Sequence, residues 1–132
     1  MKQDQIWLAE MESRRRDDEP SPGQEMADLM CRTDEVLKGL SPKDGAKLRE
    51  LSAGWRELVL VGYALSCGYA PHAADGVGEL LTDAPEGTAW RAENLRLTRA
   101  AEALASTVPE ALPLSDRWDD LCTLALVLGQ RR

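Results

Sequence analysis

The residues of this chain best suited to nucleophilic chemistry are Cys67 and His72, the second of which is the only histidine. They stand close together in sequence across a predicted turn, so that a thiol and an imidazole come within reach of each other. A thiolate–imidazole pair also needs an orienting group and an oxyanion donor, and the sequence indicates neither. We therefore interpret Cys67 as a free buried thiol and His72 as a first-turn histidine, and expect no catalytic residues.

Other polar clusters provide no better site for a metal or a phosphate. The three cysteines form no CxxC pair, and with a single histidine they lack the spacing of a metal-ligand set. Gly76-x-Gly78 is not a phosphate loop, because no predicted strand precedes it and no lysine follows it. The acidic pair Asp119-Asp120 is typical of a solvated helix face. The sequence therefore predicts neither a metal ion nor a cofactor.

The charge of the chain argues against nucleic acid as a partner. The longest basic run, Arg14-Arg15-Arg16, is followed directly by Asp17-Asp18-Glu19, which neutralises it locally. The 132 residues include 16 basic and 23 acidic side chains, for a net charge of −7. Neutralisation of phosphates supplies most of the affinity for nucleic acids, so an acidic chain is poorly suited to them. The excess of acidic side chains suits a basic or hydrophobic partner protein, and a need for solubility explains this excess equally well.

We expect a single cytoplasmic domain without a membrane span. The amino terminus has no apolar core of a signal peptide, and the longest mostly apolar run, residues 58–70, is too short and too rich in glycine to cross a bilayer. An odd number of unpaired cysteines is typical of reduced thiols.

The spacing of apolar residues by three and four predicts an all-α chain of antiparallel helical hairpins, with five to six helices. Residues 1–20 are expected to form an N-terminal helical arm with freedom to move, because the helix breaker at residues 20–23 follows it. Residues 21–132 are expected to form one helical domain. Ser21 and Ser41, each followed by proline, predict the starts of its first two helices.

The second of these helices is predicted to be long. Its apolar residues recur from Leu48 to Leu65 at a spacing of three and four without a break. Gly68 is expected to end the helix, because glycine adopts the left-handed conformation at a helix end with little steric cost. We favour one helix through this region; two helices meeting near Gly54 are the alternative, because an interior glycine is costly.

Residues 55–86 predict a tetratricopeptide-like helical hairpin, with Gly68 at the turn, Pro85 at the end, and Gly62 and Ala73 where the two helices cross. An ordinary αα-hairpin explains the same pattern. The next helix is expected over residues 89–106, burying residues such as Leu95. A final capping helix is expected over residues 116–129. Its aromatic, leucine, small and glycine residues have the spacing of the first helix of a tetratricopeptide repeat.

Residues 58–86 resemble the small tetratricopeptide-like chaperones of bacterial type III secretion systems, which escort needle subunits and other early export components. The segments that carry the resemblance are Cys67-Gly68, Ala70, Ala73, Leu80-Leu81-Thr82, Pro85-Glu86 and the ending from Trp118-Asp-Asp-Leu121-Cys122 to Leu128-Gly129. The resemblance implies a non-enzymatic protein. Such a protein holds an amphipathic helix of an export substrate in a helical groove, often with a second small co-chaperone.

The partner-binding residues that this resemblance implies lie on the concave side of the hairpins. They are Val59, Tyr63, Trp90, Leu97 and Leu126. Each of them, taken singly, also fits a plain core position.

Two other functions remain open at this point. A small acidic regulator or inhibitor would occupy a basic surface of another protein, although arginines mixed among the acids argue against this. A rise in ionic strength should release such a partner, whereas an apolar groove should retain it. A purely structural subunit would instead form a stable homo-oligomer, and the sequence leaves a homodimer open.

Overall fold

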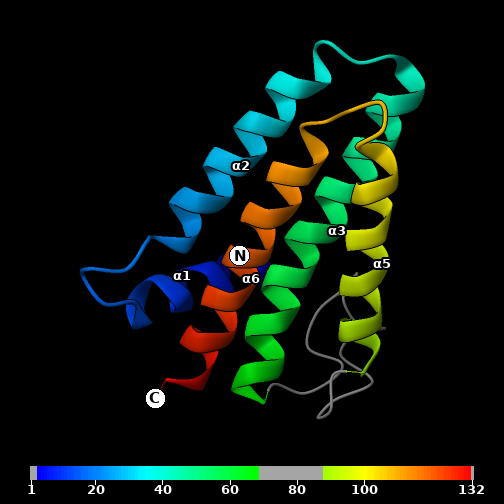
Figure 1. Cartoon of the computed structure of the whole chain (residues 1–132). Coiled ribbons are helices and arrows are strands. Elements are labelled where there is room, and N and C mark those ends of the chain that lie inside the picture. Colours follow the sequence, from blue (N-terminus) through cyan, green and yellow to red (C-terminus); the bar gives the residue numbers. More distant parts are fainter. Residues whose placement is uncertain (1–2, 69–87, 132) are drawn as a thin grey trace.

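The computed structural model describes residues 3–68 and 88–131, and within these ranges every regular element is an α-helix (Figure 1). The helices are α1 (Gln3–Arg14), α2 (Pro22–Leu37), α3 (Pro42–Cys67), α5 (Thr88–Leu104) and α6 (Ala111–Gln130). The predicted all-α class is confirmed for these residues. The tetratricopeptide-like arrangement is not, and the second helix of the predicted hairpin, with Ala73 and His72, lies outside the described residues.

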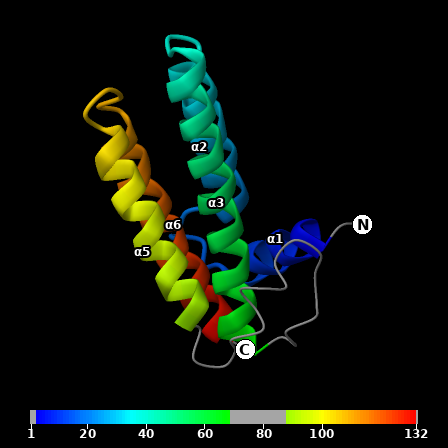
Figure 2. The ribbon, with the colours of Figure 1, turned by 90° about the vertical axis from the view of Figure 1, so that its right-hand side faces the viewer.

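Helices α3 and α6 form the centre of the packing, with α2 and α5 on either side of them. The chain makes two hairpins, α2–α3 and α5–α6. Figure 2 shows that these hairpins lie close together at the end where α3 and α6 finish, and diverge toward the connections at residues 38–41 and 105–110. The described part of the molecule is therefore closed at one end and open at the other.

Local sequence signals set the starts of α2 and α3 and the end of α3 as predicted. The hydroxyls of Ser21 and Ser41 each accept a hydrogen bond, 3.2 Å long, from the backbone N–H three residues later. Gly68 ends α3 with φ 75°, a left-handed conformation that glycine adopts without steric cost. Between these limits α3 passes through Gly54 unbroken, which confirms one long helix.

Helix α6 begins earlier than residue 116, where the sequence placed it. It starts at Ala111 and contains Pro113 in its first turn, where a proline removes no intrahelical hydrogen bond. Gly129 lies inside this helix instead of ending it. A Cβ atom at Gly129 would lie 2.5 Å from Ser66 Cβ and 2.8 Å from the Tyr63 carbonyl oxygen, so glycine is what allows α6 to approach α3.

Helix α1 is packed into the same core and is not a separate arm. Trp7 and Met11 are fully buried, and α1 contacts α2, α3 and α6. The helix also ends at Arg14, before the acidic run that follows the arginines. Its two large side chains are the reason that it stays attached, because exposing them to water would forgo the hydrophobic gain of burying two large apolar groups.

The centre of the core contains a pair of tryptophans from α3 and α6. The rings of Trp55 and Trp118 are stacked, with centroids 6.3 Å apart and planes 21° from parallel. Leu95, which the sequence placed in the core, is 51% exposed, and Met30 is 43% exposed. Each stands one or two residues from a buried leucine, and the rotation of about 100° per residue turns it outward.

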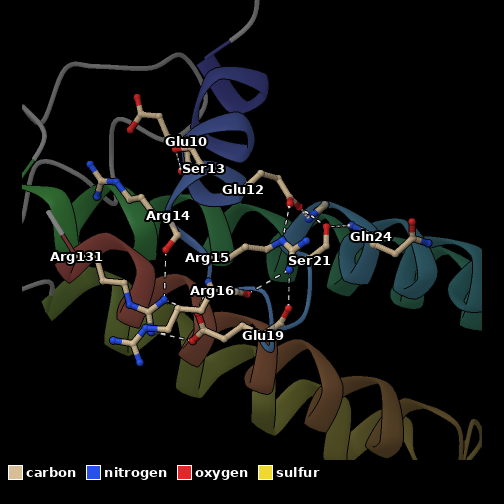
Figure 3. A network of polar contacts seen from close by, with 11 residues as sticks. Glu10, Glu12, Ser13, Arg14, Arg15, Arg16, Glu19, Ser21, Gln24 and Arg131 are labelled. Atoms are coloured by element: carbon tan, nitrogen blue, oxygen red, sulfur yellow. Dashed lines mark hydrogen bonds and ion pairs between the residues drawn. The ribbon is translucent and has the colours of Figure 1, made fainter.

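The basic run is used for contacts within the chain (Figure 3). Arg14 Nη1 donates to Cys67 Sγ at 3.1 Å and lies 3.3 Å from the carbonyl oxygen of Gly129, which joins α1 to the ends of α3 and α6. Arg15 Nε pairs with Glu12 at 3.1 Å. Arg131 pairs with Glu19, and its hydrogen bond lowers the pKa of that carboxyl to about 2. These contacts give the arginines a structural role.

Candidate functional site: the cleft between α3 and α5

A cleft of about 590 Å³ lies between the first half of α3 and the second half of α5. Its lining includes Ser41, Ser106 and Thr107, which belong to the end where the two hairpins diverge. Figure 2 shows this divergence of the helices. The residues of α3 that line it, with the cap that precedes them, are Ser41, Lys43, Asp44, Lys47, Glu50 and Leu51. Those of α5 and the turn after it are Arg96, Leu97, Ala100, Ala103, Leu104, Ser106 and Thr107.

The cleft exists because α3 and α5 are in close contact as far as Gly54 and separate beyond it. At the closed end, Gly54 lies directly against Leu97, and a Cβ atom at position 54 would be 2.9 Å from Leu97 Cδ2. Toward the open end the helices diverge, and α5 presents small side chains, Ala100 and Ala103, which do not fill the widening space. The stretch of α3 from Pro42 to Gly54 is about 18 Å long.

The cleft has an apolar floor and a polar mouth. Leu51, Leu97 and Leu104 form the floor and expose 5%, 1% and 5% of their surface. They belong to the core, so the side of each leucine that faces away from the cleft is packed against other buried residues. Lysine, glutamate and hydroxyl side chains stand around the opening. An occupant would therefore meet apolar atoms below and charged or hydrogen-bonding groups at the edges.

The charges around the cleft are divided between its two ends. Near the closed end, Arg96 is bound by Glu93 through two hydrogen bonds, which raise the pKa of the guanidinium, with a smaller contribution from Glu50. At the open end, Lys43 and Lys47 are exposed and take part in no ion pair with the described residues. The two lysines are therefore the cations of the cleft that are available to an occupant.

A second hollow differs from the cleft in how its charged side chains are paired. It measures about 340 Å³ and lies between the α1–α2 connection and α6. The cation among its lining residues is already paired: Arg117 lies 3.0 Å from Glu25, and the lining residue Glu19 pairs with Arg131. We take the α3–α5 cleft as the candidate site for this reason, together with its larger volume.

Only one of the five residues expected to bind a partner lines this cleft, and that residue is Leu97. Val59 and Tyr63 are fully buried, and Trp90 is 8% exposed, with its indole Nε1 donating to the Leu58 carbonyl at 2.8 Å. Leu126 is half-buried beside Gly62. Helical periodicity identifies an apolar face, but it does not say whether that face meets another helix of the same chain or a partner.

The lysines and alanines of the cleft were missed by sequence reasoning. Ala100 and Ala103 are spaced like one edge of a helix, and Lys43 and Lys47 share a face one turn apart. These spacings occur on many solvated helices and carry no signal of their own. The separation of α3 from α5 beyond the contact at Gly54 is what places these residues around one cleft.

The cysteines provide no catalytic centre among the described residues. Cys67 accepts its hydrogen bond from Arg14, and Cys122 is buried in the core, where desolvation raises its pKa to about 12. Within residues 3–68 and 88–131, no three histidine, cysteine or acidic side chains are placed to hold a metal ion. No helix in those ranges has the length and hydrophobicity that a membrane span requires.

Comparison of the chain with protein-family models, with curated proteins and with solved structures gives no match.

Proposed function

We propose that this chain is a protein-binding chaperone or adaptor that takes an amphipathic helix of a partner protein into the α3–α5 cleft. The observation that carries the proposal is the cleft itself, which is apolar at its floor, polar at its mouth and open at one end. Grooves of this kind bind helices whose apolar residues recur at every third or fourth position.

The length of the cleft favours a helix over a compact small molecule. The α3 residues that line it, from Lys43 to Leu51, span about 12 Å, which corresponds to about two turns of a partner helix. Two turns present apolar residues at successive levels of one helix face, so that one side of a short amphipathic helix can follow the floor from Leu51 to Leu104.

The small side chains of α5 favour the same occupant. Two helices approach closely only where short side chains lie between them. Ala100 and Ala103 form such a strip, and Ser106 and Thr107 continue it toward the mouth with hydroxyls that can hydrogen-bond to an occupant. A partner helix resting on this strip gains contact area without displacing any side chain of α5.

The class of partner follows from the resemblance described above. An export substrate of a type III secretion system carries an apolar helix that aggregates when exposed, and a groove that covers it keeps the substrate soluble. This part of the proposal depends on the likeness of residues 58–86 and 118–129 alone. A second small co-chaperone belongs to it in the same way.

Binding of a designed peptide tests the proposal directly. The probe is a fluorescein-labelled amphipathic peptide of about four turns, with leucines on one face and glutamines on the other. Its anisotropy is followed as the full chain is added. We expect saturable binding that survives high salt, because the contact is mainly apolar.

Two tryptophan variants locate the binding site. Ala103→Trp fills the cleft and should weaken binding by about tenfold or more, a loss of ~1.4 kcal/mol. Ala92→Trp places the same side chain at an exposed position of the same helix, outside the cleft, and should leave the affinity unchanged. Equal affinity in the two variants, or no binding by the unmodified chain, would contradict the proposal.

A further inference from the structure

We propose that the partner helix carries acidic side chains along the edge that faces Lys43 and Lys47, so that the cleft selects acidic amphipathic helices over neutral or basic ones. This inference rests on the proposed function, because it assumes that the cleft holds a helix. It adds the chemical class of that helix and the end of the cleft that recognises it.

The cleft is less acidic than the rest of the chain. Three cations line it, Lys43, Lys47 and Arg96, together with two acids, Asp44 and Glu50, so the formal charge of its lining is +1, and the sum is zero when Glu93, the partner of Arg96, is included. The whole chain has a net charge of −7, which leaves −8 for all the other residues. An acidic partner is repelled by most of this surface and finds its opposite charge at the cleft.

The positive charge that can act on a partner is at the open end. Arg96 is held by Glu93 and lies near Glu50, so it is neutralised within the chain. Lys43 and Lys47 have no such partner among the described residues, and Asp44 offsets only one of them. The amino terminus of α3 lies at the same end, and its helix dipole adds to the positive potential there.

The spacing of the two lysines sets the pattern that the partner should carry. They stand four residues apart on α3, which places their Cβ atoms about 6 Å from each other on one face. A partner helix lying along α3 presents residues four apart with the same separation. Two acids at that spacing on one edge, beside the apolar face, would meet both lysines together.

Three peptides with the same apolar face test this inference. Their polar edge carries two glutamates, two glutamines or two lysines at a spacing of four residues, and their affinities for the full chain are compared by fluorescence anisotropy. We expect the glutamate peptide to bind about fivefold tighter than the glutamine peptide, from two exposed ion pairs, and the lysine peptide to bind more weakly than either. At about 1 M salt the three affinities should converge, because screening acts within about 3 Å.

A pair of charge-reversal variants assigns the preference to the two lysines. The double variant Lys43→Glu, Lys47→Glu should reverse the order of the three peptides. Its control is Arg32→Glu, Arg49→Glu, which changes the net charge equally at two exposed positions outside the cleft and should keep the order. Far-UV circular dichroism establishes that both variants remain helical.

The outcomes separate this inference from the proposed function. If none of the three peptides binds, the proposed function fails, and the inference fails with it. If all three bind equally at low salt and Ala103→Trp weakens them equally, the cleft binds helices but has no acidic preference, and only the inference is overturned. A glutamate preference that persists in the double lysine variant would also overturn it.

Discussion

Gly54 of α3 lies so close to Leu97 of α5 that a Cβ atom at position 54 would stand 2.9 Å from Leu97 Cδ2 and 3.0 Å from Cδ1. Separations below 3.0 Å between real Cβ atoms and their neighbours are essentially never observed, so a larger residue must displace the leucine. This contact closes one end of the cleft. Leu97 has core on one side and the cleft on the other, and the cleft is where it can move.

Gly54→Ala should therefore change binding more than stability. The alanine gains about 1 kcal/mol of helix propensity, which offsets the cost of moving the leucine, so the free energy of unfolding should change by less than ~1 kcal/mol. The displaced Leu97 side chain narrows the cleft, and the neutral amphipathic peptide should bind more weakly. Denaturant unfolding and anisotropy measure the two effects.

A double-mutant cycle checks this explanation. Leu97→Ala should cost about 2–5 kcal/mol in the unmodified chain and less when Gly54→Ala is present, because the crowding then disappears. Strictly additive losses would mean that the two residues are not in conflict.

Gly129→Ala should destabilise the protein by about 2 kcal/mol. Its Cβ atom would meet Ser66 Cβ and the Tyr63 carbonyl oxygen, and the backbone of α3 cannot move aside as a side-chain end does. The measurement is the midpoint of urea unfolding. Gly39→Ala is the control, since a Cβ atom there meets only the Val36 carbonyl oxygen at 3.9 Å and the residue has no positive φ. A similar loss in both variants would mean that the α3–α6 contact is looser than described.

Trp7→Ala should cost about 3–5 kcal/mol, because the side chain is buried in the main core. Ile6→Ala removes a half-buried neighbour and should cost less. The comparison uses thermal and urea unfolding of the full chain. Unchanged stability after Trp7→Ala would show that α1 is an arm that detaches without disturbing the other helices.

Glu57→Gln should stabilise the protein at neutral pH. Desolvation, and then the nearby Glu93, raise the pKa of the half-buried Glu57 carboxyl above its ordinary 4.5. The folded state thus binds this proton more tightly than the unfolded state, and stability is lost as the pH rises through the range above 4.5. The glutamine variant lacks this loss, so its advantage should be largest at pH 7 and should vanish below about pH 4.

The matched change for this experiment is Glu102→Gln, at an exposed position of α5. It should alter the stability little at either pH. An advantage of Glu57→Gln that is the same at acidic and neutral pH would point to packing instead of ionisation.

The three cysteines should react with a thiol reagent in the order of their exposure. Cys31 is exposed, Cys67 is half-buried and bonded to Arg14, and Cys122 is buried with its pKa raised to about 12 by desolvation. The thiolate is the reactive species, so Cys122 should be modified only at the rate of unfolding. Mass spectrometry of peptides after timed labelling at pH 8 measures the order. Fast modification of Cys122 would contradict its burial.

The sequence was sufficient for features that depend on one residue and its near neighbours. Ser21, Ser41 and Gly68 each act through local hydrogen bonds or backbone conformation, and all three mark helix ends as predicted. The start of α6 was missed because Pro113 is a helix breaker in most positions but is tolerated in a first turn.

The site could not be predicted in the same way. The resemblance implied that Trp90 and Tyr63 lie on the concave side of the hairpins, and in the structure both side chains are buried in the core. Whether a face is covered depends on which helices pack together, and the contacts of α3 with α5 and α6 involve residues far apart in sequence. Gly54 and Gly129 lie at those contacts. The sequence alone does not tell which residues of the neighbouring helix lie against each glycine.

The tight glycine contacts also determine how the width of the cleft responds to movement. Gly129 holds α6 against the end of α3, and Gly54 holds the middle of α3 against α5. The two hairpins are therefore joined at one end and separate toward the other (Figure 2). A small change in the angle between the hairpins barely alters the distance at the joined end and alters it most at the other, near residues 38–41 and 105–110. The width of the cleft at its mouth is thus what changes most when the angle between the two hairpins changes slightly.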